Sequence, residues 1–172
     1  IDGHGNNKLN AAYALGGPEL AVKTLNRNFD LNITDYAIVD FVGLSSIIDT
    51  MGGVEVEVKE KEIQEINKYM KEVAEIKKEE ATPVKKAGMQ LLNGNQATAY
   101  ARIRNVGEGD FDRAERQKNV LSALFHKLKE QDITKYPGIA ATLLPYVKTS
   151  LSAGEIAATG IDVLKQGIGD ID

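Results

Sequence analysis

The chain has 172 residues, of which 42% are hydrophobic, a composition typical of one globular domain that can bury a core. Its 21 basic and 25 acidic side chains give a formal net charge of -4, so it has no general electrostatic attraction for nucleic acid. The absence of cysteine excludes disulfides and thiolate metal sites. No apolar run reaches the roughly 18 residues of a membrane span, so we expect any membrane anchor to lie outside these residues.

Helical and extended patterns alternate along the chain, as expected of an α/β domain. Pro18 predicts the start of a helix, because proline fits the first turn, and Ala21, Leu25 and Phe29 can share one face of that helix.

Asp40 interrupts an otherwise apolar run, YAIVDFV, at residues 36–42. A run that is apolar on both faces predicts a central strand covered by helices. A carboxylate inside such a strand costs several kcal/mol unless it is paired. We therefore expect Asp40 to face a cation or a polar pocket, with a structural role such as a backbone cap as the alternative.

The next segments show clear periodicities. Residues 44–51 predict a short helix, and the alternating valines and glutamates of residues 54–58 predict a strand with one solvated face. Residues 60–79 predict an amphipathic helix rich in lysine and glutamate. Its apolar positions are Ile63, Ile66, Met70 and Val73.

Asn93 is a good N-cap and predicts a helix over residues 96–101. The following residues should leave that helix in extended form. Because alternate residues of an extended chain share a face, Arg102 and Arg104 are expected to point together while Ile103 anchors the opposite side.

A second helix is predicted over residues 113–129, because Asp112 and Glu115 have the spacing of a capping box. Its apolar stripe, read backward from Leu128 at helical spacing, ends in Gln117 and Arg113, so both are expected to face the core. Further along, Tyr-Pro-Gly at 136–138 predicts a break. Another capping-box pattern, Ser152 with Glu155, predicts a helical pair for the tail.

Arg102, Arg104, Arg113, Arg116 and Gln117 therefore lie within one predicted helix–loop–helix. Clustered guanidiniums near a helix N-terminus favour a phosphate or pyrophosphate ligand. The alternative is that these arginines are ordinary surface charges, paired with the acidic residues of the same loop.

Four segments resemble the LytR-CpsA-Psr family of Gram-positive cell walls. They occur in the family's order over residues 8–125, and they are KLNAAYALGGPELAVKTLNRNF, IIDTMGGVEVEV, LLNGNQATAYARIR and GDFDRAERQKNVLSAL. The resemblance implies a three-layer α/β/α sandwich with a central mixed sheet, formed by residues 1–172 as one catalytic domain. It also implies that the domain's N-terminal strands and membrane anchor are missing from this chain.

The implied activity is that of a phosphotransferase outside the cell membrane. Such an enzyme moves a glycopolymer, of the teichoic acid or capsular polysaccharide type, from a polyprenyl pyrophosphate carrier onto peptidoglycan. The resemblance implies Mg²⁺ as cofactor and attachment to the membrane through an anchor.

Matching the motifs position by position implies roles for six residues. The pyrophosphate would be bound by Arg102, Arg104, Arg113 and Gln117, while Asp40 and Asp110 would orient arginines or act at the metal. Glycine is usual in the family where this chain has Asp112, and a segment resembling SIPRD is expected before Lys8 but is absent here. The general base would be an aspartate, either Asp40, Asp110 or one in the missing segment.

Two other functions are compatible with parts of this pattern. A non-catalytic module could bind a polyprenyl-phosphate lipid or an anionic glycan without transferring it. A nucleic-acid-binding regulator is disfavoured by the net charge and by the lack of a helix-turn-helix pattern.

Overall fold

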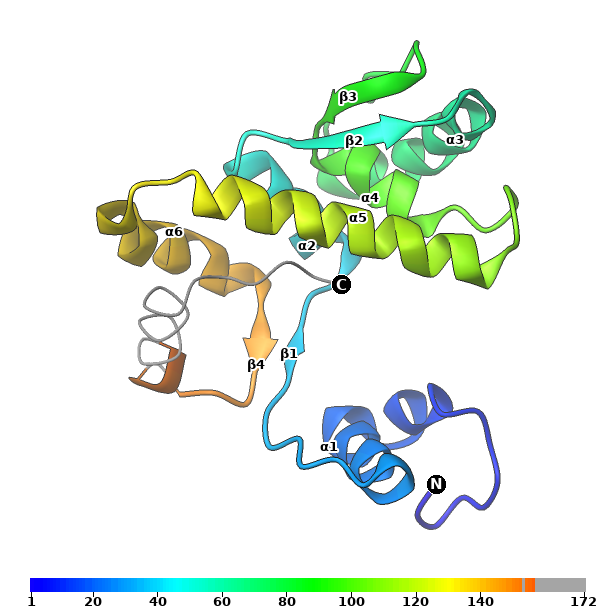
Figure 1. The fold of residues 1–172 in the computed structure, drawn as a ribbon, viewed down its shortest axis with the longest axis vertical. Helices are drawn as coiled ribbons and strands as arrows, with labels where there is room; N and C mark the ends of the chain where they lie inside the picture. Colours follow the sequence, from blue (N-terminus) through cyan, green and yellow to red (C-terminus); the bar gives the residue numbers. More distant parts are fainter. Residues whose placement is uncertain (153, 157–172) are drawn as a thin grey trace. The chain divides into compact units, whose positions relative to one another are not determined.

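The computed structural model describes residues 1–152 and 154–156, which form two compact units (Figure 1). The first unit consists of Ile1–Ile38 and the described residues from Lys148 onward, and the second of Val39–Val147. Within the described residues, each unit has one antiparallel sheet of two strands.

In the first unit, helix α1 (Ala11–Phe29) bends at Gly17, whose φ of 68° suits a residue without a side chain. Pro18 follows the bend, so the expected helix start is present, but a helical segment also precedes it. Of the expected apolar face, Leu25 is partly buried and Phe29 is exposed. Strand β1 (Ala37–Ile38) pairs with β4 (Lys148–Thr149).

The buried strand expected over residues 36–42 is wrong. Only Ala37–Ile38 is a strand, and helix α2 (Phe41–Thr50) begins directly after Asp40. The Asp40 carboxylate is exposed and accepts a hydrogen bond of 2.7 Å from the backbone N–H of Gly43. It therefore caps α2, which was the structural alternative. A local cap competes successfully here because it satisfies an otherwise unpaired amide of the first turn.

The remaining elements of the second unit begin with two strand–helix pairs and continue with helices (Figure 1). They are β2 (Val54–Val58), α3 (Glu60–Lys77), β3 (Gly88–Leu92), α4 (Gly94–Arg102), α5 (Asp110–Lys129), the 3-10 helix η1 (Ile133–Lys135), α6 (Tyr136–Leu143) and the 3-10 helix η2 (Leu144–Tyr146).

The predictions for β2 and α3 are confirmed. Strand β2 buries its three valines and exposes its two glutamates, and Val54 lies opposite Leu92 of β3. Helix α3 buries Ile66, Met70 and Val73 on the face that the sequence predicts. Both patterns are set by which positions face the core, so the period of the apolar residues was sufficient to find them.

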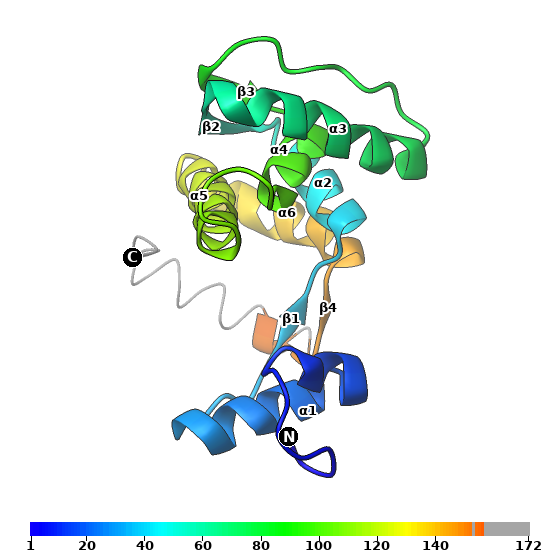
Figure 2. The same cartoon turned by 90° about the vertical axis from the view of Figure 1, so that its right-hand side faces the viewer.

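Helix α4 lies inside the second unit and contacts α2, α3, α5 and both strands (Figures 1 and 2). Every residue from Gly94 to Ala101 is buried. The α4 cap is the predicted one, with a reciprocal box in which Asn93 accepts from the Gln96 N–H at 3.0 Å and Gln96 accepts from the Asn93 N–H at 2.9 Å.

The α/β class is confirmed. The described strands form two separate antiparallel pairs, so they do not build the central sheet expected around residues 36–42. The break expected at residues 136–138 is wrong, because α6 begins at Tyr136 and Pro137 is tolerated in its first turn. Ser152 and Glu155 form the predicted box, and most of the predicted helical tail lies outside the described residues.

Candidate functional site

Helix α4 ends at Arg102, whose guanidinium is held on several sides. It lies 4.8 Å from the ring centre of Phe41 and 5.3 Å from that of Tyr69, and its Nη2 atom is 2.8 Å from a carboxylate oxygen of Glu72. The side chain is 24% exposed. Two aromatic contacts and one ion pair restrict the orientation of a guanidinium that still reaches solvent.

Arg104 lies two residues beyond the end of α4, and its surroundings are different. Ile103 between the two arginines is fully buried, as predicted, so this residue anchors the chain as it leaves the helix. Arg104 is exposed and makes no hydrogen bond or ion pair with the residues that the structure describes. Its guanidinium is therefore available to a ligand.

The start of α5 differs from the prediction. The helix begins at Asp110 and not at residue 113, with Gly109 as its N-cap. Asp112 does not cap it, because the Asp112 carboxylate instead accepts from the backbone N–H of Glu108. The Asp112 carboxylate therefore stabilises the loop before α5, and not the helix start that the sequence pattern predicted.

Arg113 lies in the first turn of α5. Its Nη1 atom is 3.0 Å from a carboxylate oxygen of Asp110, and this nitrogen is buried yet donates no hydrogen bond. The Asp110 oxygen is close enough for an ion pair but is not aligned for a hydrogen bond, so this donor is only partly satisfied and a further anionic oxygen would be stabilising. Asp110 is positioned as the orienting carboxylate that the resemblance implies, and that role stays a prediction.

The face of α5 that turns inward is not the expected one. Gln117 is exposed, whereas Arg116 and Val120 are buried. The prediction that Gln117 faces the core is wrong, because the buried face of α5 includes Arg116, the residue before Gln117. Arg113 is partly buried, three residues before Arg116 on the same side of the helix.

Arg116 is a structural residue. Its Nε donates to a carboxylate oxygen of Glu62 at 2.8 Å, and its two Nη atoms donate to the backbone carbonyls of Ile103 at 3.3 Å and Val106 at 3.0 Å. The Arg116 side chain is 5% exposed and that of Glu62 is 2% exposed. This buried pair holds the loop that carries Arg104.

Sequence reasoning missed the residues around the arginines. Glu62 and Tyr69 lie on the same face of α3 as the predicted apolar positions, and their helical spacing could have identified Glu62 as a buried acid. Phe41 and Glu72 gave no such signal, because only the packing of α2 and α3 against α4 brings them to Arg102.

Three of the predicted arginines lie on consecutive parts of this segment, and their guanidiniums are suited to binding a small anion. Arg102, Arg104 and Arg113 come from the end of α4, the following loop and the start of α5. Guanidiniums bind phosphate oxygens in pairs and remain charged at all physiological pH values. None of the helices in the described part of the chain is both long and apolar enough to cross a membrane.

Comparison with known proteins identifies the family and several relatives of this chain. The family model described as LytR_cpsA_psr matches residues 1–172. The regulatory protein MsrR of Staphylococcus aureus is 36% identical over 174 residues, which covers 99% of this chain and 49% of MsrR. The polyisoprenyl-teichoic acid–peptidoglycan teichoic acid transferase TagT of Bacillus subtilis is 35% identical over 155 residues, covering 88% of this chain and 45% of TagT.

A solved structure of TagT bound to LI-WTA has a TM-score of 0.73 and 30% identity, and the match covers 94% of this chain and 56% of that chain. The chain thus spans about half the length of the curated relatives it matches. The family model spans both units, and the fold agrees over nearly the whole chain. The chain belongs to the LytR-CpsA-Psr family.

Proposed function

We propose that this protein transfers a glycopolymer from a polyprenyl pyrophosphate carrier to peptidoglycan. The observation that carries the proposal is the incomplete pairing of two arginines on one short segment. Arg104 has no partner among the described residues, and the buried Nη1 of Arg113 lies in an ion pair with Asp110 but donates no hydrogen bond. A pyrophosphate would supply acceptors to both, beside the restrained guanidinium of Arg102.

The segment that carries these arginines is held in place before a ligand binds. Arg116 donates to the carbonyls of Ile103 and Val106, on either side of Arg104, and is itself paired with Glu62. A prearranged set of charges binds phosphates with less loss of conformational entropy. It also needs little reorganisation as charge moves during phosphoryl transfer.

One relative, TagT, indicates the substrate class. TagT is named as a transferase of teichoic acid to peptidoglycan, and it has been solved with LI-WTA and with LIIa-WTA bound. A teichoic acid donor is therefore the first to test, and a capsular polysaccharide donor the second. The reaction would take place on the extracytoplasmic face of the membrane of a Gram-positive bacterium, where both the lipid carrier and peptidoglycan are accessible.

The chemistry follows from the substrates. A peptidoglycan hydroxyl would attack the phosphorus attached to the glycopolymer, forming a new phosphodiester while the bond to polyprenyl phosphate breaks. The hydroxyl proton passes to a base, and the arginines neutralise the charge on the departing phosphate. Asp40 and Asp110 each use one carboxylate oxygen, toward the Gly43 N–H and toward Arg113, and keep the other. The general base stays a prediction among Asp40, Asp110 and an aspartate of the SIPRD-like segment.

Mg²⁺ stays a prediction from the family resemblance. In the part of the chain that the structure describes, no three histidine or acidic side chains come together in a way that could hold a metal ion. Magnesium is usually held by one or two carboxylates together with substrate phosphates, so such a cluster is not required for Mg²⁺ to bind with the donor. The reaction above is written for the protein's own side chains.

The second candidate is a module that binds the lipid-linked polymer without transferring it. MsrR, which is 36% identical to this chain, is named a regulatory protein and not a transferase, so the names of the relatives do not all imply transfer. Both candidates require the arginines to bind phosphate, and only the first predicts a covalent product.

The test uses the protein in its full natural length, with a lipid-linked teichoic acid donor and a peptidoglycan acceptor. Arg104→Ala and Arg113→Ala should each weaken donor binding by about 1.5–3 kcal/mol, the range for hydrogen bonds to charged groups, and should slow transfer. Lys118→Ala is the matched control, since it removes one positive charge from an exposed position of α5, the helix that carries Arg113.

Each result has a defined meaning. Donor binding that is unchanged in both arginine variants, with the fold intact, would overturn the proposed site. Tight donor binding by the unaltered protein with no transfer to any peptidoglycan acceptor would favour the binding module.

A further inference from the structure

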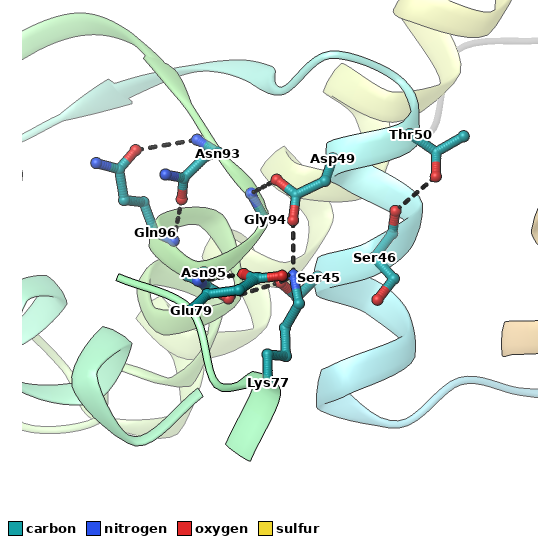
Figure 3. A network of polar contacts seen from close by, with 10 residues as sticks. All are labelled: Ser45, Ser46, Asp49, Thr50, Lys77, Glu79, Asn93, Gly94, Asn95 and Gln96. Atoms are coloured by element: carbon teal, nitrogen blue, oxygen red, sulfur yellow. Dashed lines mark hydrogen bonds and ion pairs between the residues drawn. The ribbon is translucent and has the colours of Figure 1, made fainter. Parts of the chain in front are cut away.

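Lys77, the last residue of α3, has its amino group at the centre of a polar cluster (Figure 3). Its Nζ atom lies 2.7 Å from a carboxylate oxygen of Asp49, 3.0 Å from one of Glu79 and 3.0 Å from the hydroxyl of Ser45. The side chain is only 9% exposed. Burial lowers the pKa of Lys77, but hydrogen bonds to the two acids outweigh burial and raise it above its usual value, so the amine is charged.

The three partners of Lys77 also hold the first turn of α4. Asp49 accepts from the backbone N–H of Gly94 at 2.7 Å, and Glu79 accepts from the Asn95 side chain at 3.0 Å. The Ser45 hydroxyl donates to the Asn95 side-chain oxygen at 2.9 Å. Figure 3 shows these bonds converging on the amino group of Lys77 and on the start of α4. One cation thus connects α2, α3 and α4.

Helix α4 can transmit a displacement from this cluster to Arg102. From Gly94 to Arg102 its axis is about 12 Å long at 1.5 Å per residue, and every residue before Arg102 is buried, so it cannot bend freely. Helix α2 contacts both ends of α4, with Asp49 at the start and Phe41 against Arg102. A shift of the first turn would therefore move the arginine relative to its aromatic contacts.

We propose that Lys77 is a positioning residue that sets the place of Arg102 in the phosphate site by fixing the start of α4 against α2. This inference rests on the proposed function, in which Arg102 binds the pyrophosphate. Without the amine, the carboxylates of Asp49 and Glu79 would share the cluster with no cation between them. Their repulsion and solvation would separate them and loosen Gly94 and Asn95.

The test compares Lys77→Met with Lys77→Arg in the full-length protein. Lys77→Met should raise the Kd for polyprenyl pyrophosphate in detergent micelles by roughly 10- to 100-fold, the range expected when a hydrogen bond to a charged phosphate is lost. Lys77→Arg should recover most of the affinity, because the charge is retained. Lys71→Met, at an exposed position of the same helix, should stay within about twofold.

A double mutant shows whether Lys77 acts through Arg102. If it does, Lys77→Met should cause no further loss of affinity in a protein that already carries Arg102→Ala. Losses that multiply would show that Lys77 acts elsewhere and would overturn the inference. Unchanged affinity in Lys77→Met alone, with a clear loss in Arg102→Ala, would also overturn it and leave the proposed function standing.

Hydrogen exchange separates the inference from the proposed function. Lys77→Met should speed amide exchange of residues 95–103 while α5 keeps its protection. Unchanged protection would overturn the inference whatever the ligand results. If Arg102→Ala leaves binding unaffected, it is instead the proposed role of Arg102 that fails. Should Lys77→Met not fold, Glu79→Gln provides the milder change, and the same exchange pattern is expected in weaker form.

Discussion

At the scale of single residues, arginines that look alike in the sequence have opposite roles. Arg116 is buried and donates to one carboxylate and two backbone carbonyls, whereas Arg104 is exposed without a partner among the described residues. Burial of a charge is tolerated only when its partners satisfy it. Arg116 therefore contributes to the loop's conformation, and Arg104 is the arginine of the two that a ligand can reach.

We predict that Arg116→Met destabilises the protein by about 3–5 kcal/mol, because Glu62 is left buried without a counter-charge. Arg104→Ala should change stability by no more than about 0.5 kcal/mol. Urea unfolding followed by circular dichroism measures both. The double variant Arg116→Met with Glu62→Leu should regain much of the loss, since it removes the unpaired charge. Equal stability of Arg116→Met and the unaltered protein would contradict this role.

At the scale of elements, α2 and α4 approach each other closely at a glycine. A Cβ atom at Gly94 would lie 2.0 Å from the backbone oxygen of Ser45, much closer than van der Waals contact. The same glycine donates its N–H to Asp49. The two helices can therefore pack in this way only with glycine at the first position of α4.

We predict that Gly94→Ala costs about 1–3 kcal/mol through overpacking, although alanine is the better helix former. Gly138→Ala in α6 is the matched control, because an added Cβ would meet no atom within 4 Å beyond its own helical turn and its φ is not positive. That control should be neutral or stabilising by up to about 1 kcal/mol. Thermal unfolding measures the stability of both variants. Equal melting temperatures for Gly94→Ala and Gly138→Ala would argue against close packing of α2 and α4.

At the scale of the whole molecule, charge separates this protein from nucleic-acid binders. The formal net charge is -4, and the positive charge of the site is opposed by acids such as Glu72 and Asp110. Binding to a polyanion requires many phosphate contacts at once. A local group of arginines suits one pyrophosphate better.

We predict that the protein does not retard a duplex DNA of mixed sequence at physiological salt in a gel-shift assay. The name of MsrR, a regulatory protein, makes the experiment informative. Binding at low salt that disappears between 50 and 200 mM would reflect non-specific contacts only. Retention at physiological salt, with a preference for one sequence, would reverse the conclusion.

The sequence by itself determined the features that depend on nearby residues. The α4 cap joins Asn93 and Gln96, three positions apart, and the alternation of β2 needs only its own five residues. The amphipathic face of α3 and the α/β class follow from the same short periodicities. The order of the arginine motifs along the chain could also be recognised in the sequence, and it indicated the family.

Only the tertiary structure decided which arginine turns inward and what surrounds each one. Arg116 and Glu62 are 54 positions apart, and no local pattern pairs them. The sequence pattern placed Asp40 in a buried strand, but the start of α2 made it a cap. The Lys77 cluster joins three helices in the same way. Side-chain contacts over such separations form only when the elements pack, so their energies are absent from any short window of sequence.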